Sequence, residues 1–413
     1  MIADFSEDAF LATMPLYFTP AQPISKPEHL HGRDAKLKTI QRALASPGKH
    51  VFIYGDRGIG KTSLAKTAFQ VQCPAASRTP IVACDNGVTF AQLVDAICLQ
   101  LVEVFQSNSG DLSNPGSTPA LPVESTVKTV NDAIQAIRSA APKVGGPYPI
   151  ILDEFDQLST ATDKKYVADL IKQLSDQDMN VRLIICGIGH SLEELIGVHL
   201  STDRYLAGVR LEQITHDARW QIIESACEHF KLKFDRNSII RIGQISDGFP
   251  YYVHLIGERI FWEVFDDPEL VVSISLDHYA RGIKAAIEES QTSLRQAYEL
   301  ATQKHGGSDD YEEVLWAVAD GSVMVRQTSD IYGTSYVRIV EDRGRRSAPL
   351  TKDLFYQRMN NLKKDSHGAI LRGSRTGWYG FRENVVRGYA RLRAEEAGVK
   401  VGVDHITTQA ARP

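Results

Sequence analysis

Short apolar runs separated by helical patterns dominate the first half of the chain. Each run is bounded by Gly, Pro or polar residues, which is typical of a buried strand. The strands predicted in this way are residues 51–54, 80–84, 148–152, 181–186 and 209–214. Between them apolar positions recur every three or four residues, and the predicted helices cover 34–45, 63–69, 89–105, 127–140 and 163–177. Strands that alternate with helices predict an α/β fold with a parallel sheet.

Two stretches of this half lack such periodicity. Residues 1–28 contain four prolines and predict an irregular N-terminal arm. Residues 107–125 are rich in Ser, Pro, Gly and Asn and predict a flexible surface loop.

Only helical patterns follow the last predicted strand, until a hairpin pattern near the C-terminus. The helices are predicted at 216–229, 236–244, 250–265, 311–319, 328–340 and 350–364. A strand at 369–372, a turn at 373–377, a strand at 378–382 and a last helix at 383–397 follow. Three helices and a hairpin are the pattern of a winged helix. The predicted divisions are an arm (1–28), an α/β core (29–215), a helical segment with a linker (216–300) and a winged-helix domain with a tail (301–413).

The helix predicted at 350–364 is amphipathic and basic. Its apolar residues are expected to face a core, and its cations are expected to stay outside. The apolar set is Leu354, Phe355, Met359 and Leu362, and the cations are Lys352, Arg358, Lys363 and Lys364.

Composition changes this picture mainly through charge. The chain has 413 residues, which favours two or three domains, and a net charge of −5. Residues 343–393, however, hold 13 Lys or Arg against three acids. A basic block on an acidic chain indicates a polyanion-binding module, with a solvated charged surface as the other interpretation.

No apolar run approaches the length of a membrane span, the first residues are acidic, and the five cysteines show no paired spacing. These features predict a cytoplasmic protein that makes no membrane contact.

The segment Gly55-Asp-Arg-Gly-Ile-Gly-Lys-Thr-Ser63 carries the strongest chemical signal. It lies between a predicted strand and a predicted helix, the setting of a phosphate-binding P-loop. The backbone N–H groups of Gly55, Gly58, Ile59, Gly60 and Ser63 are expected to surround a phosphate, together with the positive end of the helix dipole. In this motif Lys61 reaches the β- and γ-phosphates and Thr62 binds Mg²⁺, so ATP and Mg²⁺ are the predicted ligands.

Two adjacent acids end the predicted strand at 148–152. Because ligand sites of parallel sheets lie at the carboxyl ends of the strands, Asp153 is predicted to hold Mg²⁺ directly or through water. Glu154 is the candidate general base for an attacking water. His190 and Ser191 follow the next strand and are candidates for contact with the γ-phosphate, although Ser191 is equally suited to be a helix N-cap.

These motifs resemble the AAA+ and STAND groups of P-loop ATPases, and in general order the archaeal-type replication-initiator family and its bacterial relatives. The resemblance implies an AAA+ type P-loop NTPase sheet, a helical lid at 216–300 and a C-terminal winged helix. It places Arg33, in His31-Gly-Arg-Asp34, near the adenine, although Lys36 stands where the family box has Glu. It also makes Arg204 a candidate arginine finger in trans, with a structural salt bridge as the other interpretation. Pro250, in Gly248-Phe-Pro250, would start the lid helix over the nucleotide or serve as a plain first-turn proline.

The same resemblance suggests that the winged helix binds DNA through cations on its third helix and wing. The candidates are Arg358, Lys363, Lys364, Arg372 and Arg375. The function that follows is a slow, regulated ATPase switch in initiation, loading or recombination-type DNA transactions. It would form homo-oligomers with nucleotide and act with a helicase, nuclease or transposase. The alternative is a STAND-type signalling or antiviral-defence ATPase whose winged helix contacts protein.

Overall fold

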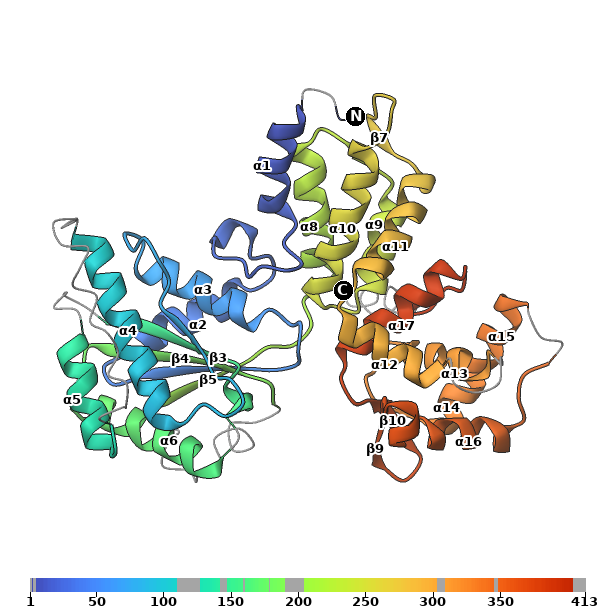
Figure 1. The fold of residues 1–413 in the computed structure, drawn as a ribbon. Helices are drawn as coiled ribbons and strands as arrows, with labels where there is room; N and C mark the ends of the chain where they lie inside the picture. The colour runs from blue at the N-terminus through green and yellow to red at the C-terminus, as the bar shows by residue number, and fades with distance from the viewer. Residues whose placement is uncertain are drawn as a thin grey trace, which may run out of the picture. The chain divides into compact units, whose positions relative to one another are not determined.

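The computed structural model describes residues 2, 5–109, 127–141, 147–158, 160–177, 179–189, 204–302, 309–344 and 348–403. The chain forms two compact units (Figure 1). We call Pro23–Glu212 the sheet unit, and Met1–Gln22 together with Gln213–Pro413 the helical unit. The prediction of a loop at 107–125 lies, from residue 110 onward, outside the described residues, and residues 107–109 belong to a helix. No helix among the described residues combines the length and the apolar character needed to cross a membrane.

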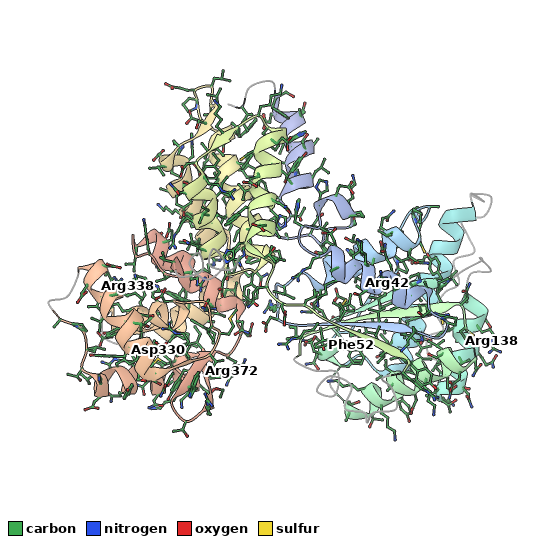
Figure 2. The ribbon with its side chains drawn as sticks, turned by 180° about the vertical axis from the view of Figure 1, so that it is seen from behind. Arg42, Phe52, Arg138, Asp330, Arg338 and Arg372 are labelled. Atoms are coloured by element: carbon green, nitrogen blue, oxygen red, sulfur yellow. The ribbon has the colours of Figure 1, made fainter. Side chains whose placement is uncertain are left out.

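A five-stranded sheet in the order β2-β3-β4-β1-β5 forms the centre of the sheet unit. All neighbouring strands are parallel, as predicted. The strands are β1 (His50–Tyr54), β2 (Ile81–Ala83), β3 (Tyr148–Asp153), β4 (Val181–Gly187) and β5 (Leu206–Arg210). β4 is buried along its whole length and β3 up to Leu152, because helices cover a parallel sheet on both faces. Figure 2 shows Phe52 of β1 within this layer.

Helices between the strands complete the sheet unit. They are α2 (Asp34–Ala45), α3 (Lys61–Gln72), α4 (Phe90–Ser109), α5 (Val130–Ala140) and α6 (Ala161–Asp176). α3 contacts β1, β3 and β4, so its first turn is fixed at the carboxyl ends of the central strands. Short 3-10 helices at Pro27–His29 and Phe155–Gln157 lie before α2 and after β3.

The helical unit begins with a correction to the sequence analysis. Instead of an irregular arm, α1 (Glu7–Tyr17) forms and packs on α8. Ser6 caps its N-terminus, and Pro15 lies in its last turn, where the helix lacks the bond that an N–H at this position would donate to residue 11. Phe10 and Met14, four residues apart, are buried, and Phe10 stacks on Phe265 with ring centroids 4.2 Å apart. The prolines of this segment led the sequence analysis to predict irregular structure, whereas residues 7–17 form a short helix whose buried side depends on this tertiary packing.

The remaining elements of the helical unit match the predicted order. The predicted lid contains α8 (His216–His229), α9 (Arg236–Ile245), α10 (Pro250–Phe265) and α11 (Leu276–Glu289), with a small parallel pair β6 (Lys233–Phe234) and β7 (Ser273–Ile274) that the sequence analysis missed. After α12 (Thr292–Thr302) come α13 (Asp310–Ala319), α14 (Thr328–Asp330), a π-helical segment (Ile331–Tyr336), α15 (Val337–Arg343), α16 (Lys352–Asn361) and α17 (Val385–Glu396).

A three-stranded antiparallel sheet, β8-β10-β9, completes the C-terminal part. β8 is Arg326–Gln327, and the hairpin of β9 (Leu371–Arg375) and β10 (Trp378–Phe381) forms the wing. Helices α13 to α16 followed by this hairpin are compatible with the predicted winged helix at the C-terminal end.

Candidate functional site

The P-loop has a backbone that requires its glycines. Gly55, Gly58 and Gly60 have φ values of +149°, +73° and +93°, a region that side chains disfavour. At Gly55 a Cβ would lie 2.5 Å from the carbonyl oxygen of Leu211. α3 begins directly after Gly60, so the loop delivers its N–H groups and the helix N-terminus to one point.

The Lys61 side chain folds back over this loop. Its Nζ donates to the carbonyl oxygens of Gly55 (3.2 Å) and Asp56 (2.8 Å). Burial lowers the pKa of the ammonium, and the nearby acids Asp156 and Asp153 oppose that shift. A half-buried ammonium held only by neutral carbonyls is well placed to exchange them for phosphate oxygens.

Thr62 and Asp153 meet at the carboxyl end of β3, as the sequence analysis expected. The Thr62 hydroxyl donates to Asp153 Oδ2 at 2.7 Å. A hydroxyl and a carboxylate are hard oxygen ligands, the type that Mg²⁺ takes beside a nucleotide, so the pair fits this ion. The neighbouring Ser63 Oγ accepts from the backbone N–H of Ile24 (3.1 Å) and so anchors the segment that precedes α2.

Glu154 has a strained backbone at the same edge. Its φ is +55°, rare for a residue with a side chain, and its N–H donates to Asp153 Oδ1 at 3.0 Å. The side chain is exposed. Strain at a polar residue beside a candidate metal site suggests function rather than packing.

Asp156 is a residue whose position the sequence analysis overlooked. Its Oδ1 accepts from the backbone N–H of Ile188 at 2.7 Å, just beyond the end of β4. It thereby fixes the chain that leads to His190, which itself lies outside the described residues. The signal was the third acid in Leu-Asp-Glu-Phe-Asp156, two residues after Glu154.

Arg33 is buried and supports the P-loop through a hydrogen bond to its backbone. Its Nη2 donates to the carbonyl oxygens of Ile59 (3.0 Å) and Glu212 (2.8 Å). Only 5% of the residue is exposed, and burial lowers the pKa of the guanidinium to about 10. These bonds make Arg33 a positioning residue for the loop, and its expected contact with adenine stays a prediction.

Arg204 lies at the opposite end of the sheet from Lys61. It precedes β5, whose first residue, Leu206, pairs with His50 at the start of β1. The P-loop follows the other end of β1, about 17 Å away for five residues of strand. Arg204 is exposed, stacks 4.5 Å above the Tyr205 ring and donates to its hydroxyl, which in turn donates to Asp176. It therefore cannot serve the nucleotide of its own chain, and a role in trans stays a prediction.

Pro250 is the first residue of α10 and belongs to the helical unit, so its predicted contact with nucleotide also remains a prediction. Two residues before it, Gly248 has φ +79°, and a Cβ there would overlap the side chain of Gln213. The preceding residue, Asp247, is 2% exposed.

Asp247 joins the predicted lid to the C-terminal helix through two fully buried arginines. Its carboxylate pairs with Arg387 at 2.9 Å and with Arg391 at 3.0 Å, both on α17. Arg391 also donates to the carbonyl oxygens of Ala319 (2.8 Å) and Gln244 (2.7 Å). Burial lowers the pKa of both guanidinium groups, and the Asp247 charge opposes that shift.

The basic block of the C-terminal part is less free than its sequence suggests. Five of its 13 cations form ion pairs with acids. Two others, the arginines at positions 345 and 346, lie outside the described residues. The paired ones are Arg343, Arg358, Arg387, Arg391 and Arg393. Those left on α16, the wing and their flanks are Lys352, Lys363, Lys364, Arg372, Arg375 and Arg382.

Two expectations for α16 are wrong. Arg358 does not point outward: it pairs with Asp310 of α13 at 3.0 Å and lies 5.1 Å over the Tyr311 ring. Leu354, expected in the core, is 42% exposed, whereas Phe355 and Met359 are buried as predicted. The other candidates remain available. Arg372 (labelled in Figure 2) and Arg375 belong to β9, and Lys363 and Lys364 follow α16.

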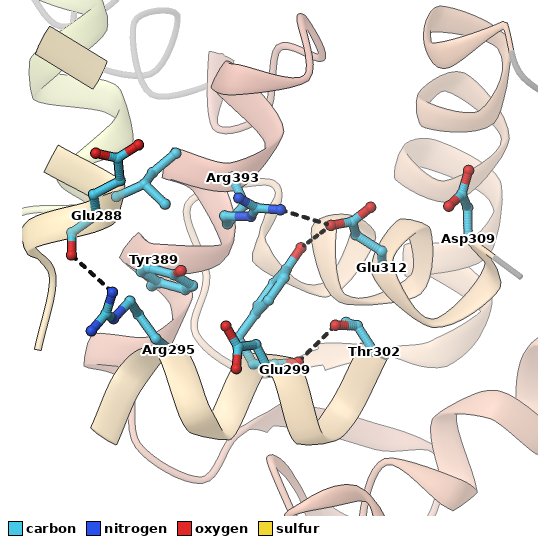
Figure 3. A pocket seen from close by; sticks show the side chains of 10 residues that line it. Glu288, Arg295, Glu299, Thr302, Asp309, Glu312, Tyr389 and Arg393 are labelled. Carbon is cyan, nitrogen blue, oxygen red and sulfur yellow. Dashed lines mark hydrogen bonds and ion pairs between the residues drawn. The ribbon is translucent and has the colours of Figure 1, made fainter. Parts of the chain in front are cut away.

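A cleft of about 400 Å³ opens among α11, α12, α13 and α17 (Figure 3). Its polar groups bond largely to one another: Tyr298 donates to Glu312 at 2.9 Å, Arg393 approaches the same carboxylate, and Arg295 donates to the Glu288 carbonyl. These bonds tie the helices together. Residues 303–308, between two lining residues, lie outside the described chain, so the cleft is not a candidate site.

Comparisons with known proteins agree with this geometry. Residues 29–185 match the family described as AAA ATPase domain. No curated protein matches the chain. A Walker-type ATPase of Pyrococcus abyssi has a similar structure, with a TM-score of 0.54, 15% identity, and coverage of 90% of this chain and 99% of that one.

Two further structures align with lower scores. Cdc6p of Pyrobaculum aerophilum has 14% identity, coverage of 93% and 98%, and a TM-score of 0.44. The Orc1 protein of Aeropyrum pernix, solved in complex with DNA, has 14% identity, coverage of 90% and 95%, and a TM-score of 0.45. The family match and the P-loop geometry together identify residues 29–185 as an AAA ATPase domain of the AAA+ P-loop type.

Proposed function

We propose that this protein is a cytoplasmic ATP-dependent switch that binds and slowly hydrolyses ATP and binds duplex DNA through its winged helix. Its role would be in initiation, loading or recombination-type DNA transactions. The observation that carries the proposal is the Thr62–Asp153 hydrogen bond of 2.7 Å beside Lys61 and the N-terminus of α3. It brings a cation, a phosphate-binding helix terminus and two metal ligands to one sheet edge.

The residues of this edge have distinct roles in the proposed reaction. Lys61 exchanges the carbonyl oxygens of Gly55 and Asp56 for β- and γ-phosphate oxygens. Thr62 and Asp153 hold Mg²⁺ directly or through water. The ion, when bound, neutralises charge on the β- and γ-phosphates. Glu154 accepts the proton of the attacking water, and its exposed side chain is free to approach that water.

Arg204 contributes to the same reaction from a second copy of the chain. Because it lies at the far end of its own sheet, only an assembly can bring it to a γ-phosphate. We therefore expect nucleotide to favour a homo-oligomer in which each Arg204 completes the site of a neighbour.

DNA binding rests on the six remaining cations of α16, the wing and their flanks, of which Arg372 is half-buried and the other five are exposed. They lie on the winged-helix part of an otherwise acidic chain, so they can hold a polyanion there without attracting it elsewhere. Each phosphate they neutralise should make the affinity fall by about 0.9 log units per log unit of salt.

Two measurements test the proposal. ATP hydrolysis should depend on Mg²⁺, Lys61→Ala should abolish ATP binding, and Glu154→Gln should bind ATP but fail to hydrolyse it. Asp153→Ala should weaken Mg²⁺-dependent binding. Unchanged turnover in folded Glu154→Gln protein would show that the base is another residue.

The second measurement is duplex binding with ATP at two salt concentrations. Steep weakening with salt is expected, and Arg372→Ala with Arg375→Ala should reduce the slope by up to about two contacts while ATP binding is unchanged. If the protein binds no DNA at low salt, the winged helix serves contacts with a protein partner such as a helicase, nuclease or transposase.

A further inference from the structure

The exposed side of α16 carries amides and an apolar side chain rather than cations. Leu354, Gln357 and Asn360 are all exposed, and their spacing of three residues places them on one side of the helix. Asp353 lies on the same side, in the first turn. The one arginine of the helix, Arg358, turns to the other side and pairs with Asp310.

Cations lie at both ends of the stripe formed by Leu354, Gln357 and Asn360, which are uncharged, whereas the acid Asp353 lies only in the first turn, next to Lys352. Lys352 is the first residue of α16, and Lys363 and Lys364 lie two and three residues beyond its last residue, Asn361. Arg375 stands on the wing, 4.0 Å over the Trp378 ring. A neutral centre with cations on either side matches a DNA groove, whose base edges lie between two rows of phosphates. A surface that only holds phosphates would have no reason to keep its centre uncharged.

The wing also orients one of the amides. The Tyr379 hydroxyl of β10 donates to Asn360 Oδ1 at 2.9 Å. The Asn360 Nδ2 hydrogens therefore remain available, and Oδ1 retains its second lone pair. The next residue, Asn361, differs, because its Nδ2 donates to the Tyr311 hydroxyl and so joins α16 to α13.

These side chains have a known complementarity to base edges. A carboxamide donates to adenine N7 and accepts from adenine N6, and an apolar side chain contacts the thymine methyl group. We propose that Gln357 and Asn360 read adenines in the major groove, with Leu354 against a thymine methyl, so that the winged helix prefers duplexes with A·T pairs at these positions. This inference rests on the proposed DNA binding and adds its sequence preference.

The test uses the full-length protein with ATP. A selection from random duplexes should return a preferred site, and the affinity is then compared between that site and versions with single A·T pairs replaced by G·C. Asn360→Ala and Gln357→Ala should each reduce discrimination at one position, by about 5- to 150-fold, the range for one bidentate contact. Lys363→Ala is the matched control at the end of the same helix: it should lower the affinity for every duplex equally and reduce the salt dependence.

The outcomes separate this inference from the proposed function. If the protein binds no duplex, both are refuted. If it binds all duplexes equally, or if Asn360→Ala and Gln357→Ala weaken all duplexes by one common factor, only the base-reading inference is refuted. Unchanged tryptophan fluorescence in the variants would exclude misfolding as the cause.

Discussion

Replacing Asp247 with asparagine tests how the predicted lid is joined to the winged helix. Asparagine is the right substitution because Asp247 has φ +51°, a conformation that Asn tolerates far better than Ala. The change removes one negative charge and keeps the size of the side chain. Arg387 and Arg391, both fully buried, would then lose the carboxylate with which they pair, and Asp320 would be the acid that still acts on their charges.

The expected loss follows from this burial. Removing one partner of a buried ion pair costs about 3–5 kcal/mol, because the remaining charge cannot regain water. The arginines retain carbonyl acceptors at Ala319 and Gly321, and asparagine keeps an oxygen, so we expect the lower end, about 3 kcal/mol. With a urea m-value of about 2–3 kcal/mol per M, the midpoint of unfolding should fall by at least about 1 M.

Tryptophan fluorescence is a selective probe for this measurement. All four tryptophans, Trp220, Trp262, Trp316 and Trp378, belong to the helical unit. The matched control is Glu396→Gln, which removes the half-exposed partner of Arg393 on the same helix and should cost less than about 0.5 kcal/mol. If Asp247→Asn shifts the midpoint no more than Glu396→Gln does, the buried pairs do not hold the unit together.

Three further outcomes are expected. Arg358→Ala should destabilise the helical unit by about 1–3 kcal/mol, since it removes the cation that pairs with buried Asp310, yet it should not change the salt dependence of DNA binding as Arg375→Ala does. Arg33→Ala should weaken ATP binding in a nucleotide titration because the P-loop loses its support at Ile59. Mixing Arg204→Ala protein with Glu154→Gln protein should restore part of the hydrolysis, and no rescue despite intact assembly would make Arg204 structural.

The geometry of the candidate nucleotide site could be predicted where local sequence determines the backbone. The P-loop needs positive φ at its glycines, and the motif supplies Gly at each of those positions. The meeting of Thr62 and Asp153 was predictable for a different reason: strand β3 runs parallel to the others, so its carboxyl end reaches the edge where α3 begins. The role of Arg33 as a buried support could not be predicted, because its hydrogen-bond partners are backbone oxygens that lie 26 and 179 residues away along the sequence.

Charge was the least predictable feature. Counting cations treats Arg387 and Arg391 as surface groups, but their partner Asp247 comes 140 residues before Arg387 and meets it only in the folded unit. The position of Arg358 was predicted wrongly for the same reason. Helical spacing within α16 cannot show that Asp310, on helix α13, lies beside Arg358 and pairs with it.

The buried pairs bear on how the proposed nucleotide binding and the proposed DNA binding could be coupled. Asp247 lies three residues before Pro250, at the start of α10, and holds α17 of the winged-helix part. Two more links connect the same regions: the Tyr252 hydroxyl donates to the Val385 carbonyl at 2.7 Å, and Arg241 pairs with Glu395 at 2.6 Å.

A fragment beginning near residue 305 would lack Asp247 and would leave the two buried arginines of α17 unpaired. The winged helix is therefore not an independent module on a flexible tether. We expect residues 216–300 and 301–403 to respond as one packed body, because displacing either part alone would expose these ion pairs. A change that starts at the first turn of α10 would then reach α16 and the wing through packed side chains, without a hinge between them.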